Sequence, residues 1–334
     1  MSKREEFIRN GALISLNPQH VLIAYGRNEK KGPVWYVPDY FFRDPHPFHQ
    51  FSSWAILERV ELAASLEEIA EEVGELKWQA SPKEQFFSTV ANAKRAFTSG
   101  ELKKVVPYIS ERAEHSLTLG QRAHVLSRLL KQSNERQHLY GIWNEAAGVM
   151  GATPEILFAL SDQIETMAVA GTGKTEAIFD DPKERHEHQL VIDGIRSALH
   201  PFGEVVVGET ALMRLPQLYH LYTPMRVSYR ERPSFEAVAR ALHPTPALGG
   251  LPQDPALTWL EHFDRTLPRG TFGAPFGCQH GPFSRALVAI RNLRFTPNHL
   301  HIYAGCGIVP RSSAENEWQE CRNKASSVRA LCGL

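Results

Sequence analysis

The order of apolar segments predicts an α+β protein built on a large, mostly antiparallel sheet system. Strand-like and helix-like runs come in blocks, whereas a doubly wound parallel fold alternates them strictly. The chain has 334 residues, 43% of them hydrophobic, so it can bury a substantial core as one large domain or as two. We find no internal repeat, low-complexity tract or clear linker.

The first hundred residues predict strands followed by helices. Residues 11–42 hold the apolar runs ALISL, HVLIAYG and VWYVPDYF, whose alternation is typical of an antiparallel meander. Residues 53–99 are helical in pattern. The second helix of that stretch is expected to begin with Ser81 as N-cap, Pro82 at the first position and Glu84 at the third.

The remaining two thirds of the chain return to strands and end on a helix. The long runs RALVAIRNLRF and HLHIYAG each predict one strand, and the terminal segment predicts a helix. The other predicted strands cover residues 104–106, 138–145, 155–160, 163–171, 204–209 and 219–228, and the other predicted helices cover 182–200, 234–242 and 255–266.

Composition narrows the class of protein and its partners. Lys+Arg and Asp+Glu are equal at 37 each, so no global field attracts nucleic acid or an anionic membrane. No apolar run is long enough for a membrane span, and MSKREEFIRNG lacks the apolar core of a signal peptide. The 4 cysteines show no CxxC spacing, which disfavours structural zinc and a disulfide framework. We therefore expect a cytoplasmic protein.

The stretch from Ala304 to Lys324 is the most informative one. Its glycine-rich turn leads into a helix on which Glu317, Glu320 and Lys324 share one face at spacings of i, i+3 and i+7. Two carboxylates beside an ammonium, next to a loop with open backbone N–H groups, can hold a divalent cation and an anionic substrate together. The alternative is a solvated helix face with an ordinary Glu320–Lys324 pair.

The segment AGTGKT at 170–175 looks like the end of a phosphate-binding loop, but the pattern is incomplete. Ala168 stands where the full motif needs glycine, and Asp180-Asp181-Pro182 interrupts before any helix begins. The sequence therefore predicts no nucleotide site here.

Four ionisable residues stand inside or beside apolar segments. Lys104 lies in KKVV, Glu155 follows GATP, Glu187 belongs to a predicted helix and Arg291 lies within LVAIRNL. A buried arginine in a central strand needs a carboxylate partner from the protein or from a ligand. Each residue alone is explained as a cap or surface charge, but their joint presence indicates a site.

From about Lys104 to its end, the sequence resembles the chorismate-binding enzymes. These include isochorismate synthase, salicylate synthase and the synthase subunits that make anthranilate and aminodeoxychorismate. The resemblance implies a single domain of two antiparallel sheets packed face to face, with helices outside and the active site in a cleft between them. Residues 1–100 match poorly and are expected to be a shortened amino-terminal part of that fold, and residues 101–334 the catalytic region. The matching segments, in order, are KVV, GATPE (151–155), VAGT (169–172), ERHEHQLVIDGIRSAL (184–199), LPQLYHLYTPM (215–225), LHPTPALGGLP (242–252), GTFGAPFG (270–277), VAIRNL (288–293) and YAGCGIVPRSSAENEWQECRNKA (303–325).

Two features favour isochorismate synthase within that family. LHPTPALGG is similar to the isochorismate synthase form, whereas anthranilate and aminodeoxychorismate synthases carry a glycine- and serine-containing sequence there. Aminodeoxychorismate synthases place a nucleophilic lysine where this chain has Ala170. The methyl group leaves room for water, the nucleophile that isochorismate formation requires.

The resemblance also assigns the acid, the base and the metal ligands. Lys104 resembles the base that activates water, and Glu155 resembles the acid that protonates the departing C4 hydroxyl. Glu187 and Glu320 match the positions that bind Mg2+, and Glu317 is expected to reach the ion through water.

The other assigned residues hold the substrate. Lys324 is expected to contact the ring carboxylate, and Arg291, Tyr303 and backbone N–H groups near Gly305 the enolpyruvyl carboxylate. His243, Ala247 and Leu248 are expected to line the ring pocket together with Ala170, Gly171 and Thr172.

The implied function is Mg2+-dependent conversion of chorismate to isochorismate for menaquinone or for a salicylate- or catechol-type siderophore. The alternatives are a salicylate synthase, which also eliminates pyruvate, and a non-catalytic chorismate-binding subunit. Because water is the inferred nucleophile, no amidotransferase partner is expected. We expect a monomer or a weak homodimer.

Overall fold

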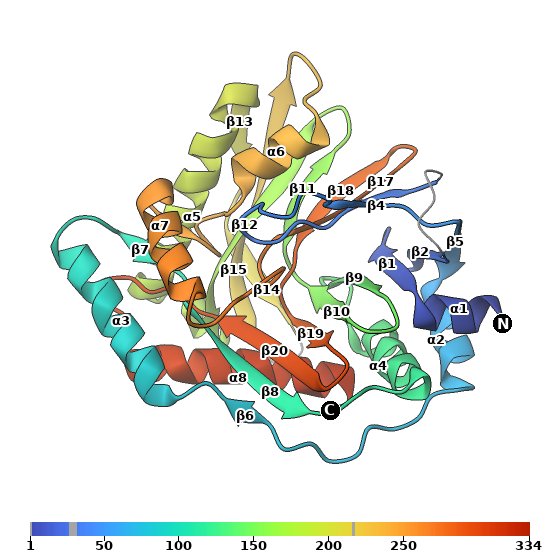
Figure 1. Ribbon diagram of the computed structural model, residues 1–334. Helices are drawn as coiled ribbons and strands as arrows, with labels where there is room; N and C mark the ends of the chain where they lie inside the picture. The colour runs from blue at the N-terminus through green and yellow to red at the C-terminus, as the bar shows by residue number, and fades with distance from the viewer. Residues whose placement is uncertain (1, 27–31, 216–217) are drawn as a thin grey trace.

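Two large antiparallel sheets form the body of the protein, with helices on their outer faces (Figure 1). The computed structural model describes residues 2–26, 32–215 and 218–334. In those ranges every pair of neighbouring strands is antiparallel, and side chains of both sheets meet in one buried cluster that includes Ile14, Leu22, Tyr140, Phe276 and Leu287. The predicted α+β fold with face-to-face antiparallel sheets is confirmed.

The first sheet gathers strands from the beginning, middle and end of the chain. Alternating apolar residues let each strand bury one face between the sheets and the other beneath helices. Its order is β5 (Ser53–Glu58), β2 (His20–Tyr25), β1 (Gly11–Ser15), β9 (His138–Trp143), β10 (Gly148–Thr153), β19 (Asn292–Phe295), β20 (His299–Gly305), β8 (Tyr108–Glu114) and β6 (Gln79–Ala80).

The second sheet is built mainly from the chain after residue 155. Its order is β13 (Gly203–Val207), β15 (Tyr219–Tyr229), β12 (Ile164–Gly173), β11 (Ile156–Leu160), β18 (Phe283–Val288), β17 (Pro275–His280), β3 (Val34–Tyr36) and β4 (Phe48–His49), with β14 (Ala211–Arg214) paired to β15. A separate two-stranded pair joins β7 (Lys104–Val105) to β16 (Gly250–Leu251).

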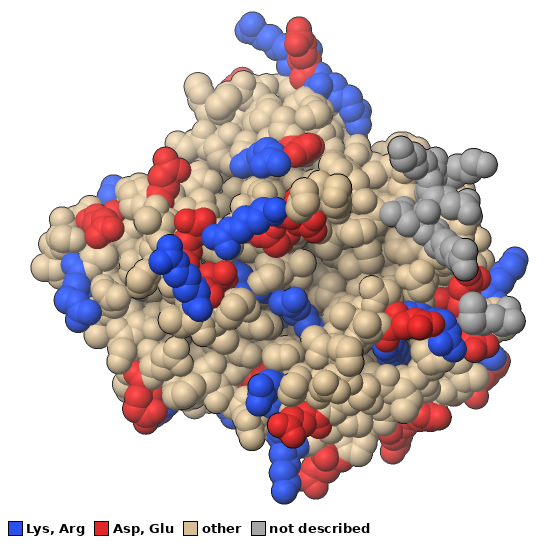
Figure 2. All heavy atoms as spheres, in the orientation of Figure 1, with Lys and Arg blue, Asp and Glu red and all other residues tan. Residues whose placement is uncertain are grey.

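Helices cover both outer faces, α4 and α8 below the first sheet and α5 and α6 against the second in Figure 1. No helix among the described residues is both long and apolar enough to cross a bilayer. Charged side chains of both signs are scattered over the face in Figure 2. The helices are α1 (Lys3–Arg9), α2 (Arg59–Glu67), α3 (Lys83–Thr98), α4 (Leu119–Gln132), α5 (Pro182–Leu199), α6 (Phe235–Leu242), α7 (Gln253–Asp264) and α8 (Ala314–Cys332), with 3-10 turns at Glu176–Phe179 and His200–Phe202.

The amino-terminal part differs from its prediction in three respects. The run VWYVPDYF does not extend the meander, because its strand β3 joins the second sheet through β17. Residues 53–58, predicted as helical, form edge strand β5 paired with β2. Pro82 rather than Ser81 is the N-cap of α3. Residues 27–31 of the predicted meander and 216–217 of the segment LPQLYHLYTPM lie outside the described residues.

The chain crosses between the sheets at two functional candidates. Strand β10 lies in the first sheet and β11 in the second, and Glu155 stands between them. The predicted single strand RALVAIRNLRF is in fact two strands, β18 in the second sheet and β19 in the first, divided at Arg291, whose φ is 56°. The crossings are adjacent, because the Ala152 amide donates to the Arg291 carbonyl at 3.2 Å.

Candidate active site

A small cavity of about 70 Å³ lies beside these crossings, and most of the predicted site residues line it. A wider cavity of about 390 Å³ adjoins it, and Thr172 and Glu320 line both. Ala170 lines the smaller cavity with a side chain that leaves open space where a longer one would fill it. The predicted residues on its lining are Glu155, Ala170, Gly171, Thr172, Glu187, Ala247, Leu248, Arg291, Tyr303, Gly305, Glu320 and Lys324.

Glu155 is a buried carboxyl without an ion pair among the described residues. Its side chain is 2% exposed, and its Oε1 has no hydrogen-bond partner there. Burial raises the pKa of Glu155 to about 8, although the positive charges of Lys104, Lys324 and Arg291 act against that rise. Glu155 is therefore mostly protonated at neutral pH and can donate a proton into the cavity.

Lys104 lies just behind the cavity wall and is fully buried. Strand β7 fixes its backbone through the pairing of Lys104 with Leu251 of β16. Its Nζ lies 2.9 Å from Oε1 of Glu187 on α5. Gly307 permits this pair, because a Cβ there would lie 1.9 Å from that oxygen and 3.0 Å from Cε of Lys104. Only glycine leaves the space that the ion pair occupies.

Arg291 is held by His220, which the sequence analysis missed. The Nη2 group of Arg291 donates to Nε2 of His220 at 3.0 Å, while Nδ1 of His220 lies 2.9 Å from the Gly171 carbonyl. Burial and the charge of Arg291 hold the pKa of His220 well below its usual value, so the ring is neutral and can accept at Nε2. Burial lowers the pKa of Arg291 to about 10, which leaves the guanidinium charged at neutral pH.

Lys324 places a second positive charge on the lining of the cavity. Its Nζ donates to Oε1 of Glu320 at 2.6 Å and to the Gly305 carbonyl at 2.9 Å. Burial disfavours the ammonium, but Glu320 holds the pKa of Lys324 above its ordinary value. Tyr303 lines the cavity with its ring stacked on Phe272 at 5.6 Å, and its hydroxyl donates to the Pro268 carbonyl at 3.1 Å.

His243 does not belong to the cavity, which corrects its predicted role. The ring is 5% exposed and packs edge-on against Tyr40 and Phe42. Its Nε2 lies 2.7 Å from the Tyr40 carbonyl, so the side chain holds the HPTPALGG turn to the amino-terminal segment. Ala247 and Leu248, farther along that turn, do line the cavity.

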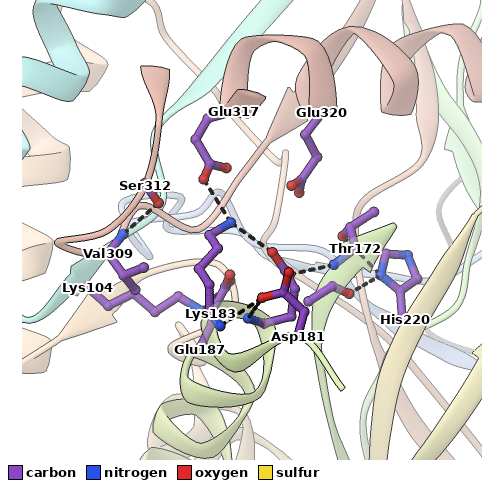
Figure 3. A network of polar contacts seen from close by, with 12 residues as sticks. Lys104, Thr172, Asp181, Lys183, Glu187, His220, Val309, Ser312, Glu317 and Glu320 are labelled. Atoms are coloured by element: carbon purple, nitrogen blue, oxygen red, sulfur yellow. Dashed lines mark hydrogen bonds and ion pairs between the residues drawn. The ribbon is translucent and has the colours of Figure 1, made fainter. Parts of the chain in front are cut away.

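Four carboxylates from α5 and α8 gather where the two cavities meet, and Figure 3 labels three of them, Glu187, Glu317 and Glu320. Glu187, Glu317 and Glu320 were predicted, whereas Glu184 was missed although it stands three residues before Glu187 on one helix face. Asp181 caps α5 by accepting from the Lys183 and Glu184 amides, which fixes where that face begins. Glu184 accepts from the Thr172 amide at 3.0 Å, beside Gly171, whose φ is 77°.

Burial and mutual repulsion act strongly within this cluster. Burial and the charge of Glu320 raise the pKa of Glu317 to about 7, and burial and Glu187 raise the pKa of Glu184. Burial also disfavours the charged form of Glu187, but Lys104 and Lys183 hold its pKa below the usual value. A hard divalent cation bound by these oxygens would relieve that repulsion, so the chemistry of the donors fits Mg2+.

The carboxylates are nevertheless not assembled as a preformed set of ligands. Among the described residues, no three metal-ligating side chains come together closely enough to hold an ion. One lysine lies between two of them instead: Nζ of Lys183 is 2.8 Å from Glu317 and 2.9 Å from Glu184. The ammonium of Lys183 therefore stands among the oxygens that suit a cation.

Comparisons with known proteins agree on one family. The model of the family described as chorismate binding enzyme matches residues 42–332. The salicylate biosynthesis isochorismate synthase of Pseudomonas aeruginosa is 33% identical over 265 residues, which are 75% of this chain and 55% of that protein. The isochorismate synthase EntC of Escherichia coli is 27% identical over 314 residues, 87% of this chain and 79% of EntC.

A solved structure shows the same fold. MenF, the menaquinone-specific isochorismate synthase from Escherichia coli, superposes with a TM-score of 0.82 at 18% identity, over 99% of this chain and 91% of that one. The chain thus spans 91% of the MenF structure and 55% of the length of the Pseudomonas aeruginosa protein.

Proposed function

This chain belongs to the chorismate binding enzyme family, and from that membership we propose that it converts chorismate to isochorismate with the help of Mg2+. The observation that carries the proposal is Glu155, a buried carboxyl with a pKa of about 8 on the lining of a cavity that Arg291 and Lys324 also line. The isomerisation needs a proton donor at neutral pH beside binding groups for two carboxylates.

Glu155 supplies the acid. Water adds to C2 of chorismate, the ring double bonds shift and the C4 hydroxyl leaves. The proton that makes this hydroxyl a good leaving group comes from Glu155, which burial keeps protonated. The reaction leaves a carboxylate on Glu155, which must regain a proton before the next turnover.

Lys104 is assigned as the base that takes a proton from the attacking water. It can do so only as the neutral amine, yet Glu187 at 2.9 Å stabilises the ammonium. The assignment therefore requires that the negative charge of Glu187 be balanced by another cation during turnover.

Arg291 and Lys324 are assigned to the two substrate carboxylates. Arg291 is oriented by His220 and has a planar fork suited to bidentate capture. Lys324 is held at the turn after β20 by the Gly305 carbonyl and lies beside Glu320. Arg291 is buried and the side chain of Lys324 is only 15% exposed, so their attraction for a carboxylate is weakly screened by water.

Mg2+ is assigned to Glu184, Glu187, Glu317 and Glu320. When bound, the ion would neutralise the ring carboxylate and lessen its repulsion from these glutamates. The raised pKa values of Glu184 and Glu317 support the binding of a cation in this place.

Product analysis in 18O-labelled water tests the proposal. Chorismate with Mg2+ should give isochorismate carrying one heavy oxygen, and added ammonium should give little aminated product. Ala170→Lys should block hydration or trap an adduct with the ring, because the new ammonium would occupy the space left by the methyl group. Efficient amination by the wild type, or unimpaired hydration by Ala170→Lys, would contradict the proposal. Salicylate and pyruvate as main products would keep the site but assign the function of a salicylate synthase.

A further inference from the structure

Lys183 stands in the middle of the carboxylate cluster, with its ammonium directed to glutamates of two helices (Figure 3). We propose that Lys183 is an internal counter-ion, which holds the cluster together in the metal-free protein and which a divalent cation must displace in order to bind. The inference rests on the proposed function and adds a residue that sets the affinity of the site for Mg2+.

The contacts of Lys183 join the two helices that carry the carboxylates. Its Nζ lies 2.9 Å from Oε1 of Glu184 on α5 and 2.8 Å from Oε1 of Glu317 on α8. Burial disfavours this ammonium, but Glu317, Glu187 and Glu184 hold the pKa of Lys183 well above its ordinary value. An ammonium that pairs with two carboxylates in this way occupies the oxygens that a metal ion would need.

The charge of the cluster explains why the Lys183 ammonium and a divalent cation cannot both stay in it. When all four glutamates are ionised, they face three ammoniums, those of Lys104, Lys183 and Lys324, so the cluster lacks only one positive charge. A divalent ion added to this set would turn the surplus positive and would lie beside the Lys183 ammonium in a poorly screened place. Displacement of Lys183 removes that repulsion and frees oxygens of Glu184 and Glu317.

The wider cavity offers space into which the Lys183 ammonium can move. The residue lines the wider cavity, together with Lys174 and Arg311, and its side chain is 23% exposed while that of Glu317 is 2% exposed. A lysine stem can rotate into that space while the start of α5 stays fixed by Asp181. The exchange therefore needs no movement of the helices.

Binding of MgCl2 to the whole protein, measured by calorimetry, tests the inference. Lys183→Met should lower the Kd for Mg2+ at least about tenfold, because the competing cation is gone. Lys174→Met is the matched control, since Lys174 is an exposed cation on the same cavity with no ion pair among the described residues, and it should change the Kd less than about threefold. An unchanged Kd in Lys183→Met, or an equal change in both variants, would overturn the inference.

A second measurement uses the wild type and so does not depend on a variant that folds. Acetic anhydride should acetylate Lys183 slowly in EDTA and several-fold faster with Mg2+, while Lys174 in the same molecule keeps its rate, as followed by mass spectrometry. Equal rates for Lys183 with and without bound Mg2+ would show that the ion does not displace it.

The outcomes also separate this inference from the proposed function. If the wild type binds no Mg2+ even with chorismate but Lys183→Met does, the inference stands and the metal assignment in the proposed function fails for the native chain. If neither protein binds Mg2+, both fail. If the wild type binds Mg2+ and turns over chorismate, and Lys183→Met has the same Kd for Mg2+, only the inference fails.

Discussion

The two ends of the smaller cavity shift the pKa of a buried glutamate in opposite directions. At the crossing between the sheets, burial raises the pKa of Glu155 to about 8. On α5, Glu187 is similarly buried, at 7% exposed against 2%, yet its pKa is held below the ordinary value. The difference follows from their cationic neighbours, because Glu187 has the Lys104 ammonium at 2.9 Å and the charge of Lys183 nearby, whereas Glu155 has no ion pair among the described residues.

Two glutamates in one cavity thus have different protonation states at neutral pH. Desolvation acts on both carboxyls, but only a direct ion pair outweighs it. Glu155 feels Lys104, Lys324 and Arg291 as distant charges, which moderate its pKa without lowering it to the usual value. At neutral pH, Glu155 at one end of the cavity is therefore mostly protonated, and Glu187 at the other end is ionised.

The largest effect is expected when the proposed Mg2+ is removed from the charged end. Activity should fall to background in EDTA and return with Mg2+, and Glu320→Gln should abolish turnover, because the carboxylates would then repel the substrate's own carboxylate. Glu315→Gln is the control on the same helix, where Glu315 pairs with Lys83 at the surface. Steady-state product formation measures the effect, and full activity in chelator would remove the metal from the mechanism.

The neutral end is tested by Glu155→Gln, which keeps the size of the side chain and removes its proton. The variant should lower kcat about 10²-fold or more, the usual scale for a general acid, and Lys104→Ala should do the same for the base. Glu165→Gln on the exposed part of β12 should leave kcat within about twofold. Near-wild-type turnover of a folded Glu155→Gln protein would assign the proton to another group.

Much of this site followed from local sequence pattern. Helical periodicity brought Glu317, Glu320 and Lys324 to one face, and a charged residue in an apolar run marked Arg291. Glu184 carried the same helical signal relative to Glu187 and was overlooked. The strand β5 carried no such signal, because its apolar residues are consecutive in the sequence and alternate only in their burial, and its neighbours on α2 made the whole segment look helical.

Other features depend on tertiary contacts that no local pattern contains. Lys183 meets Glu317, and His220 meets Arg291, only because distant segments converge at the junction of the sheets. His243 was assigned to the pocket from its place in HPTPALGG, but packing against Tyr40 and Phe42 turns it into the core. The break of a predicted strand at Arg291 likewise follows from the crossing between sheets, which hydrophobic alternation does not reveal.

Gly307→Ala should disturb the charged end while leaving its charges in place. The added Cβ would lie 1.9 Å from Oε1 of Glu187, so the Lys104–Glu187 pair must shift. We expect a loss of about 1–3 kcal/mol in the free energy of unfolding, typical of overpacking, and a fall in kcat of about tenfold. Gly74→Ala, with nothing within 4 Å of the added Cβ, should change neither quantity in urea unfolding and activity assays. Wild-type stability in Gly307→Ala would show that the close approach is not required.

The smallest expected effect, and the most direct test of the comparison, is the dependence of stability on pH. Glu155 has a folded pKa of about 8 against an ordinary value of 4.5, so between those values the folded state binds more protons than the unfolded state. Stability from this group is therefore complete below about pH 4.5 and is lost as the pH rises through 8. Glu187 has the opposite sign, because its folded pKa is lowered. Its contribution is present above about pH 4.5 and is lost as the pH falls through the folded pKa.

The two variants Glu155→Gln and Glu187→Gln should accordingly diverge in opposite pH windows. Measured by thermal unfolding from pH 4 to pH 9 in EDTA, the Tm of Glu155→Gln relative to the wild type should rise by a few degrees as the pH increases from 5 to 9, since the variant cannot ionise there. Relative to the wild type, Glu187→Gln should be least stable near neutral pH, where the Lys104 ammonium loses its partner, and should recover as the pH falls below about 4.5. Parallel curves for the two variants would mean that both carboxyls carry the same charge at neutral pH, and the division of the cavity into a proton-donating end and a charged end would then be wrong.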